Sequence, residues 1–150
     1  MKKKLLGSAL ILCLFAGGSW AATAKRTWTA TTFINAATEA YDTLAGTTEE
    51  YTSAVNMVTN GYLGAHVEVD LNFDATPTDN LIINVWTSLD GSTWSDIAAN
   101  SITVDNGTDP AQLGFVVEGW AYFRIGVVQD GSTDTHDFRV SYRAWQVDIS

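Results

Sequence analysis

The sequence is poor in cysteine, histidine and proline. Its 150 residues include one cysteine, two histidines and two prolines. Cys13 lies in an N-terminal segment that we interpret as a leader, so the rest of the chain has no thiol for a disulfide or a nucleophile. Neither an H-x-x-x-H nor a G-x-S-x-G pattern occurs, which argues against common zinc and serine hydrolase sites. Stability must therefore come from an ordinary hydrophobic core.

Basic residues are also scarce. Eight Lys and Arg face 17 Asp and Glu, which gives a net charge of −9. A phosphate backbone requires a basic face, and anionic lipid repels an acidic protein. We therefore expect neither nucleic acid nor a membrane surface as a partner. Beyond the N-terminal segment, no apolar run approaches the ~20 residues of a membrane span.

The N-terminal segment has the pattern of a signal peptide. Lysines occupy positions 2–4, an apolar stretch covers 5–18, and an A-x-A cleavage signal lies at 22–24, with 19–21 as an alternative. Cys13 does not follow a small residue, which disfavours lipidation. We predict a secreted, periplasmic, or cell- or virion-surface protein with a signal peptide over 1–24 and a single domain over 25–150.

The rest of the chain is patterned as short strands separated by turns rich in Gly, Asn and Asp. In Ala65–Asp74 five apolar residues alternate with polar ones, as in a strand with one buried face. Residues 35–46 fit either a short helix or a loop with a short strand. The strand spacing predicts an all-β fold, an antiparallel two-sheet sandwich that is jelly-roll-like. The other strands are expected at 26–34, 51–58, 81–89, 101–104, 112–117, 121–128 and 138–145.

Two motifs carry a resemblance to known proteins. Residues 88–94 are Ser-Leu-Asp-Gly-Ser-Thr-Trp, and residues 121–125 are Ala-Tyr-Phe-Arg-Ile. Over 81–128 this pair resembles the S-x-D-G-x-x-W turn and the aromatic-Arg-apolar strand of discoidin (F5/8 type C) and galactose-binding-like jelly rolls. The resemblance implies a jelly roll with Trp94 at the edge of the core, and it transfers no ligand residue. Residues 61–145 also resemble small jelly-roll structural and decoration proteins of phages.

The titratable residues form no strong catalytic constellation. His66 and His136 lie in polar runs, and we expect them at the surface without a metal or catalytic role. Glu68 and Asp70 could form an acid–base pair, but their spacing on a wet strand face fits solubility better. We therefore predict that the protein is not an enzyme, with a carboxylate-based hydrolase as the least favoured alternative.

Two loops rich in oxygen ligands are candidates for binding calcium. Hard cations prefer such groups, although Asx-Gly turns have this composition for conformational reasons alone. We predict no cofactor, with calcium as the one candidate, and the residues concerned are Asp105, Asp109, Asp130 and Asp134.

Aromatic and arginine side chains on predicted outer faces are the candidates for binding a partner. Exposed aromatics stack on sugars or pack against another protein, unless a second layer of the same fold covers them. The candidates are Trp86, Tyr122, Arg124, Arg139, Arg143 and Trp145.

Two of these arginines are expected to face each other. Reflection about the loop near residues 131–132 places Arg124 opposite Arg139, which is unfavourable unless an anion lies between them. The acidic face formed by Glu68, Asp70 and Asp74 is the obvious complement. This face belongs either to a neighbouring strand of the same chain, which we favour, or to another copy.

These observations predict an exported or virion-type structural or decoration module that assembles with copies of itself or with another surface protein. The alternative is a secreted carbohydrate-binding module that uses exposed aromatics. The Thr-rich segment over 22–34 either pairs as an ordinary first strand or is donated to a neighbouring copy.

Overall fold

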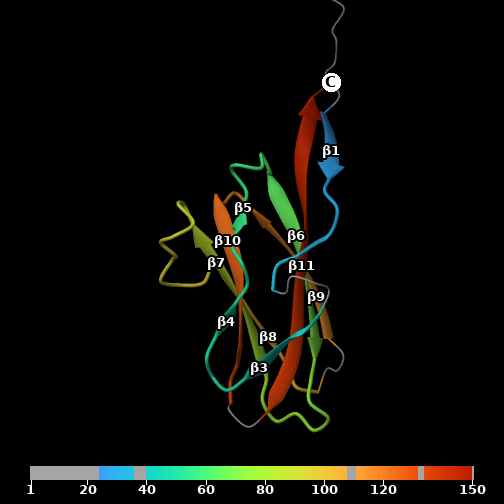
Figure 1. Cartoon of the computed structure of the whole chain (residues 1–150), viewed down its shortest axis with the longest axis vertical. Coiled ribbons are helices and arrows are strands. Elements are labelled where there is room, and N and C mark those ends of the chain that lie inside the picture. Colours follow the sequence, from blue (N-terminus) through green and yellow to red (C-terminus); the bar gives the residue numbers. More distant parts are fainter. Residues whose placement is uncertain (1–23, 36–39, 108–110, 132–133, 150) are drawn as a thin grey trace, which may run out of the picture.

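The computed structural model describes residues 24–35, 40–107, 111–131 and 134–149. This part of the chain is built from β-strands and contains no helix (Figure 1). The strands are β1 (Ala24–Trp28), β2 (Thr32–Phe33), β3 (Asp42–Ala45), β4 (Glu50–Tyr51), β5 (Val55–Asn56), β6 (Gly64–Asn72), β7 (Leu81–Ser88), β8 (Asn100–Val104), β9 (Ala111–Glu118), β10 (Tyr122–Gln129) and β11 (Thr135–Ile149). The predicted all-β class is confirmed.

Two antiparallel sheets make up the sandwich. The first has the order β1-β11-β6-β9, with β2 and β3 also paired to β11. The second has the order β4-β10-β7-β8, with β5 also paired to β10. Because β1, β2 and β3 follow one another along β11, and β4 and β5 along β10, each sheet has four strand positions. Along the chain, β1–β3 pair with β11, β4 and β5 pair with β10, β6 pairs with β9, and β7 pairs with β8. This nested pairing of early strands with late ones is the order of a jelly roll.

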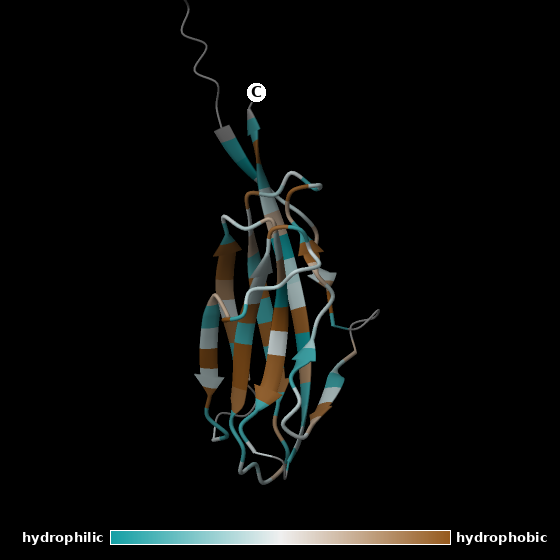
Figure 2. Ribbon diagram, turned by 90° about the vertical axis from the view of Figure 1, so that its left-hand side faces the viewer, coloured by the Kyte–Doolittle hydropathy of each residue, from teal (hydrophilic) through white to brown (hydrophobic). Residues whose placement is uncertain are grey.

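The alternating pattern of β6 determines which of its side chains form the core. Val67 and Val69 are fully buried between the sheets, while Glu68 and Asp70 lie on the outer face. Sheet two contributes a matching set of buried side chains, among them Leu81, Ile83, Phe123, Ile125 and Val127. Figure 2 shows this alternation as brown and teal bands along the strands.

The segments before residue 60 are short and interrupted. Residues 42–45 form a strand, so the loop-and-strand alternative for residues 35–46 is confirmed there and the helix is wrong; residues 36–39 lie outside the described ranges. The expected strand over 51–58 is divided into β4 and β5.

The N-terminal strand pairs within its own chain. β1 lies antiparallel to the end of β11, with Ala24 opposite Ile149 and Trp28 opposite Trp145. Together they project beyond the rest of the sandwich (Figure 1). The structure therefore places this segment as an ordinary first strand. The signal peptide lies almost wholly outside the described residues and stays a prediction, and no helix in the described part is long and apolar enough to cross a membrane.

Candidate interaction surface

The loops of the sandwich gather at two ends with different chemistry. One end carries the loops over 57–63, 89–99 and 119–121, because Gly64 and Glu118 close sheet one there and Ser88 and Tyr122 close sheet two. We call it the apolar end. The opposite end, which we call the polar end, carries residues 46–49, 73–80, 105–107 and 130–131 of its loops.

Large apolar side chains are exposed at the apolar end. They come from all three of its loops and have between 44% and 82% of their surface exposed: Val58, Leu63, Leu89, Ile97 and Trp120. Exposed apolar residues are normal when scattered singly, whereas a cluster of them marks an interaction site. These five residues define the candidate interaction surface.

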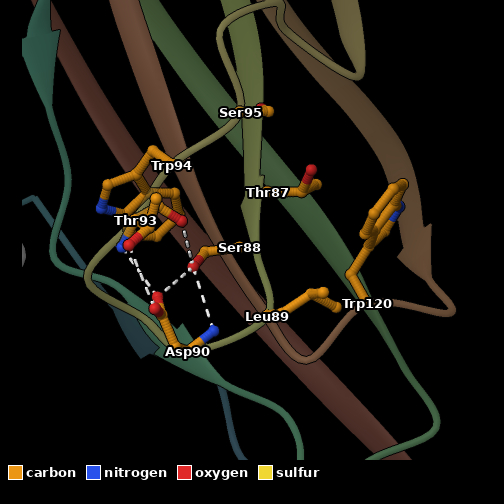
Figure 3. Close-up of a pocket in the computed structure, with 8 residues that line it drawn as sticks. All are labelled: Thr87, Ser88, Leu89, Asp90, Thr93, Trp94, Ser95 and Trp120. Carbon is orange, nitrogen blue, oxygen red and sulfur yellow. Dashed lines mark hydrogen bonds between the residues drawn. The ribbon is translucent and has the colours of Figure 1, made fainter.

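A cavity of about 470 Å³ opens beside two residues of this surface, Leu89 and Trp120 (Figure 3). Leu89 and Trp120 stand at its side, and Thr87 and Ser95 point into it from the strand and the loop behind. The Ser95 hydroxyl is buried and has no hydrogen-bond partner in the structure. The cavity could therefore accept an apolar group together with one polar contact.

The Asp-Gly turn that shapes this cavity is held by its own side chains. The Asp90 carboxylate accepts the amide N–H groups of Ser92, at 2.8 Å, and Thr93, at 2.7 Å. These bonds favour the ionised form and hold the pKa of Asp90 well below its usual value. Gly91 has a φ of 78°, which a side chain would disfavour. The turn thus presents Leu89 from a rigid support.

The outer face of sheet two forms a closed network. Glu49 accepts hydrogen bonds from the Trp86 indole and the Asn84 amide, both at 2.8 Å, and from the Tyr51 hydroxyl at 2.6 Å. The bond to Glu49 is the main cause of a raised pKa at Tyr51. The Arg124 guanidinium lies between two rings, 3.9 Å from the centroid of Tyr51 and 4.3 Å from that of Trp94. Trp86 and Arg124 are therefore engaged within the chain.

Tyr122 and Trp94 also make internal contacts. The Tyr122 hydroxyl accepts a hydrogen bond from Asn56 at 3.1 Å, and its ring lies against Gly91. Trp94 is half-buried under Arg124 instead of filling the core edge as the resemblance implied.

The outer face of sheet one contains an ion pair that the sequence indicated. Arg139 lies opposite Asp70 and binds its carboxylate at 2.8 Å, so the intramolecular interpretation of the acidic face is confirmed for this pair. Arg143 donates to the Thr29 carbonyl at 3.2 Å. The expectation that Arg124 faces Arg139 is wrong, because β10 and β11 belong to different sheets.

Trp145 is not an exposed platform. It is only 4% exposed, because Trp28 packs on it at 5.1 Å between ring centroids and the Arg26 guanidinium lies 4.8 Å from its ring. Its other side lies against Gly64, where a Cβ atom would come within 2.0 Å of the ring. A second layer from the same chain therefore covers this tryptophan.

At the polar end, carboxylates hold the loops together. Asp134 accepts the amide N–H groups of Thr78 and Asp79, and these bonds lower its pKa. Asp130 accepts the Asn80 amide N–H at 2.8 Å. His136, expected at the surface, is 1% exposed, and its Nδ1 accepts the Asp74 N–H at 3.2 Å. The histidine is buried because it faces the core from β11.

The four aspartates considered as calcium ligands have different surroundings in the structure. Asp130 and Asp134 brace loops, Asp105 is exposed, and Asp109 lies outside the described residues. Among the described residues no group of three or more His, Cys, Asp or Glu is arranged to hold a metal ion. His66 is half-buried on the outer face of β6.

Sequence reasoning missed the five residues of the apolar end. Each lies in a loop next to a strand end, where an isolated apolar residue resembles the continuation of a strand. Only the strand order, which brings the three loops together, shows that these residues form one surface.

Comparisons with known proteins support the fold. No family model and no curated protein matches the sequence. The PBSX exported protein XepA is similar in structure, with a TM-score of 0.54 and 12% identity over 81% of this chain and 38% of XepA. A structure from work titled "Bacillus endospore appendages form a novel family of disulfide-linked pili" aligns with a TM-score of 0.48 and 17% identity over 83% of this chain and 91% of that one. At this identity the likeness to XepA shows a shared β fold alone, and the discoidin resemblance stays a prediction.

Proposed function

We propose that this protein is an exported, non-catalytic structural module that assembles through its apolar end, with copies of itself or with another cell- or virion-surface protein. The observation that carries the proposal is the presence of five exposed apolar side chains in the three loops of this end, two of which, Leu89 and Trp120, line a cavity. Burying a large apolar side chain contributes about 1.5–3 kcal/mol, so a few of these residues supply a useful binding energy. The turn at Asp90 holds one of them, Leu89, in place before binding.

The engagement of the charged residues supports the non-catalytic part of the proposal. Asp90 and Asp134 serve as acceptors in turns, and Asp70 pairs with Arg139. A general acid or base needs a proton partner in a substrate pocket. These carboxylates instead bind backbone amides or arginine of the same chain.

The export part of the proposal depends on the predicted leader. Its basic start, apolar stretch and A-x-A signal are the supporting pattern. XepA, whose structure is similar, is an exported protein, which is consistent with this location.

The test is a pair of substitutions in the apolar end. Leu89→Asp and Ile97→Asp should each lower self-association, measured by light scattering, without lowering the melting temperature, because both side chains are more than 80% exposed. Thr47→Asp adds the same charge to an exposed site at the polar end and should leave association unchanged. Equal effects of all three variants would contradict the proposal, because net charge alone would then explain them.

A second function, carbohydrate binding, is favoured by Trp120 alone. This ring is 44% exposed beside the cavity (Figure 3), and such rings stack on sugars. A glycan array that gives signals lost in Trp120→Ala and retained in Trp86→Ala would favour this alternative. An array without signals would remove it.

A further inference from the structure

One edge of the sandwich lacks the usual protection against pairing. β9 pairs with β6 and with no other strand in the described part of the chain, so its outer side is a sheet edge. Its register with β6 runs unbroken from Ala111 to Glu118. The strand contains no proline, lysine or arginine, which are the residues that natural proteins place on edges to block pairing.

The other three edges differ from β9. The edge along β11 is divided into three short strands, and β1 carries Lys25 and Arg26. The edge along β10 is divided into β4 and β5. β8 is unbroken but has five residues against eight in β9. Among these edges β9 is therefore the longest continuous one.

The side chains of β9 are exposed on both faces. Val116 points outward and is 55% exposed. Leu113 and Phe115 point toward the core, yet both are only partly buried because no strand covers them at this side. Phe115 and Val116 line a groove of about 180 Å³ that continues to Trp120 at the apolar end. The open edge and the candidate interaction surface are thus contiguous.

We propose that β9 pairs antiparallel with β9 of a second copy, joining the two first sheets into one. This inference rests on the proposed assembly function and names the strand that performs it. Charge supports a second copy as the occupant. β9 carries one charged side chain, Glu118, at its last position, so two acidic chains can approach along it with little repulsion. Antiparallel pairing places the two Glu118 side chains at opposite ends, whereas parallel pairing would set them side by side.

Cysteine crosslinking tests the pairing directly, because the chain beyond the predicted leader has no cysteine. Three single variants are expressed as the full chain: Gln112→Cys, Val116→Cys and Glu118→Cys. The exported form of each is purified and oxidised, alone and in pairwise mixtures. All three positions are exposed on the same face of β9. Antiparallel pairing in one register should give disulfide dimers in only one of these samples. Parallel pairing in register should instead give a disulfide dimer with every variant oxidised alone. Thr103→Cys, exposed on β8, is the control and should remain monomeric under oxidation.

A charge on the edge gives a second, independent measurement. Val116→Lys should raise the concentration for half-association by about tenfold or more, because it adds the charge that protects natural edges. Thr47→Lys adds the same charge to an exposed site at the polar end and should leave it unchanged. If the unmodified chain associates but no combination crosslinks and Val116→Lys has no effect, edge pairing is wrong while the proposed function stands. A strictly monomeric chain overturns both the edge pairing and assembly with copies of itself, and leaves assembly with another surface protein as the proposed function.

Discussion

The two ends of this sandwich differ in how their loops meet solvent: hydrogen bonds hold the loops at the polar end, and apolar side chains are exposed at the apolar end. At the polar end, Asp130 and Asp134 satisfy the amide groups of the neighbouring loop, and His136 satisfies that of Asp74. At the apolar end, Leu89 and Ile97 expose more than 80% of their surface to water. These side chains at the polar end bind amide groups of the same chain, whereas the exposed apolar side chains at the other end are not covered by the chain.

This difference indicates where binding energy is available. Internal hydrogen bonds stabilise the fold and leave little to gain from a partner. Exposed apolar surface gains free energy only when something covers it. Substitutions at the polar end should therefore change stability, and substitutions on the exposed rim of the apolar end should change association.

The largest effect on stability is expected at Gly64, the first residue of β6. A Cβ atom there would lie 2.0 Å from the Trp145 ring, so Gly64→Ala forces the ring to move. We expect a loss of about 1–3 kcal/mol in the free energy of unfolding, measured in urea. Gly107→Ala has open space around its Cβ and should be neutral. Equal stability of both variants would show that Trp145 does not pack as described.

A somewhat smaller loss is expected at the polar end in His136→Leu. The substitution retains an apolar core side chain but removes the acceptor for the Asp74 amide. A fully buried amide left unsatisfied costs about 1–3 kcal/mol, and the loss here should be at the lower end because this bond is only partly buried. His66→Leu, half-buried on the outer face of the same sheet, is the control. A larger loss in the free energy of unfolding for His66→Leu than for His136→Leu would contradict this account of the polar end.

Protonation of Asp134 at acid pH should lower the stability of the folded protein. Its pKa is lowered in the folded protein, mainly by the amides of Thr78 and Asp79. The carboxylate therefore contributes stability that is complete above the ordinary value of 3.8 and is lost as the pH falls through the folded value. Melting temperatures between pH 2 and pH 6 should fall less steeply in Asp134→Asn than in the unmodified chain. Asp96→Asn, at an exposed site, should follow the unmodified chain.

The smallest effect on stability is expected at Ile97. Because this side chain is 81% exposed, Ile97→Ser should change the free energy of unfolding by no more than about 0.5 kcal/mol. Thermal unfolding measures this. A clear loss of stability would mean that Ile97 packs within its own chain, and the contrast between the two ends would weaken.

The strands were predictable because alternation determines them locally. The pattern in Ala65–Asp74 corresponds to β6 within two residues at its end, and the apolar segment at 81–89 to β7. The ion pair of Arg139 with Asp70 followed from the same patterns, since both residues were placed on outward faces.

Strand order was not predictable in this way. Arg124 and Arg139 were assigned to one hairpin because their strands are consecutive, but the connection between β10 and β11 crosses from one sheet to the other. Trp145 stayed a candidate binding residue because the pairing of β1 over it is a contact of long sequence separation, so the sequence did not decide whether it is covered. The apolar end was not predicted for the same reason, because its three loops are far apart in the sequence and only the strand order brings them to one end.

The most direct test is the mass of the exported chain in solution, measured by light scattering over concentration at low and high salt. We predict association that grows with concentration and persists in about 1 M salt, where charge interactions are screened within about 3 Å. Apolar contacts are not weakened by such screening. A monomer at every concentration, or an oligomer that dissociates as salt is added, would contradict self-assembly through the apolar end.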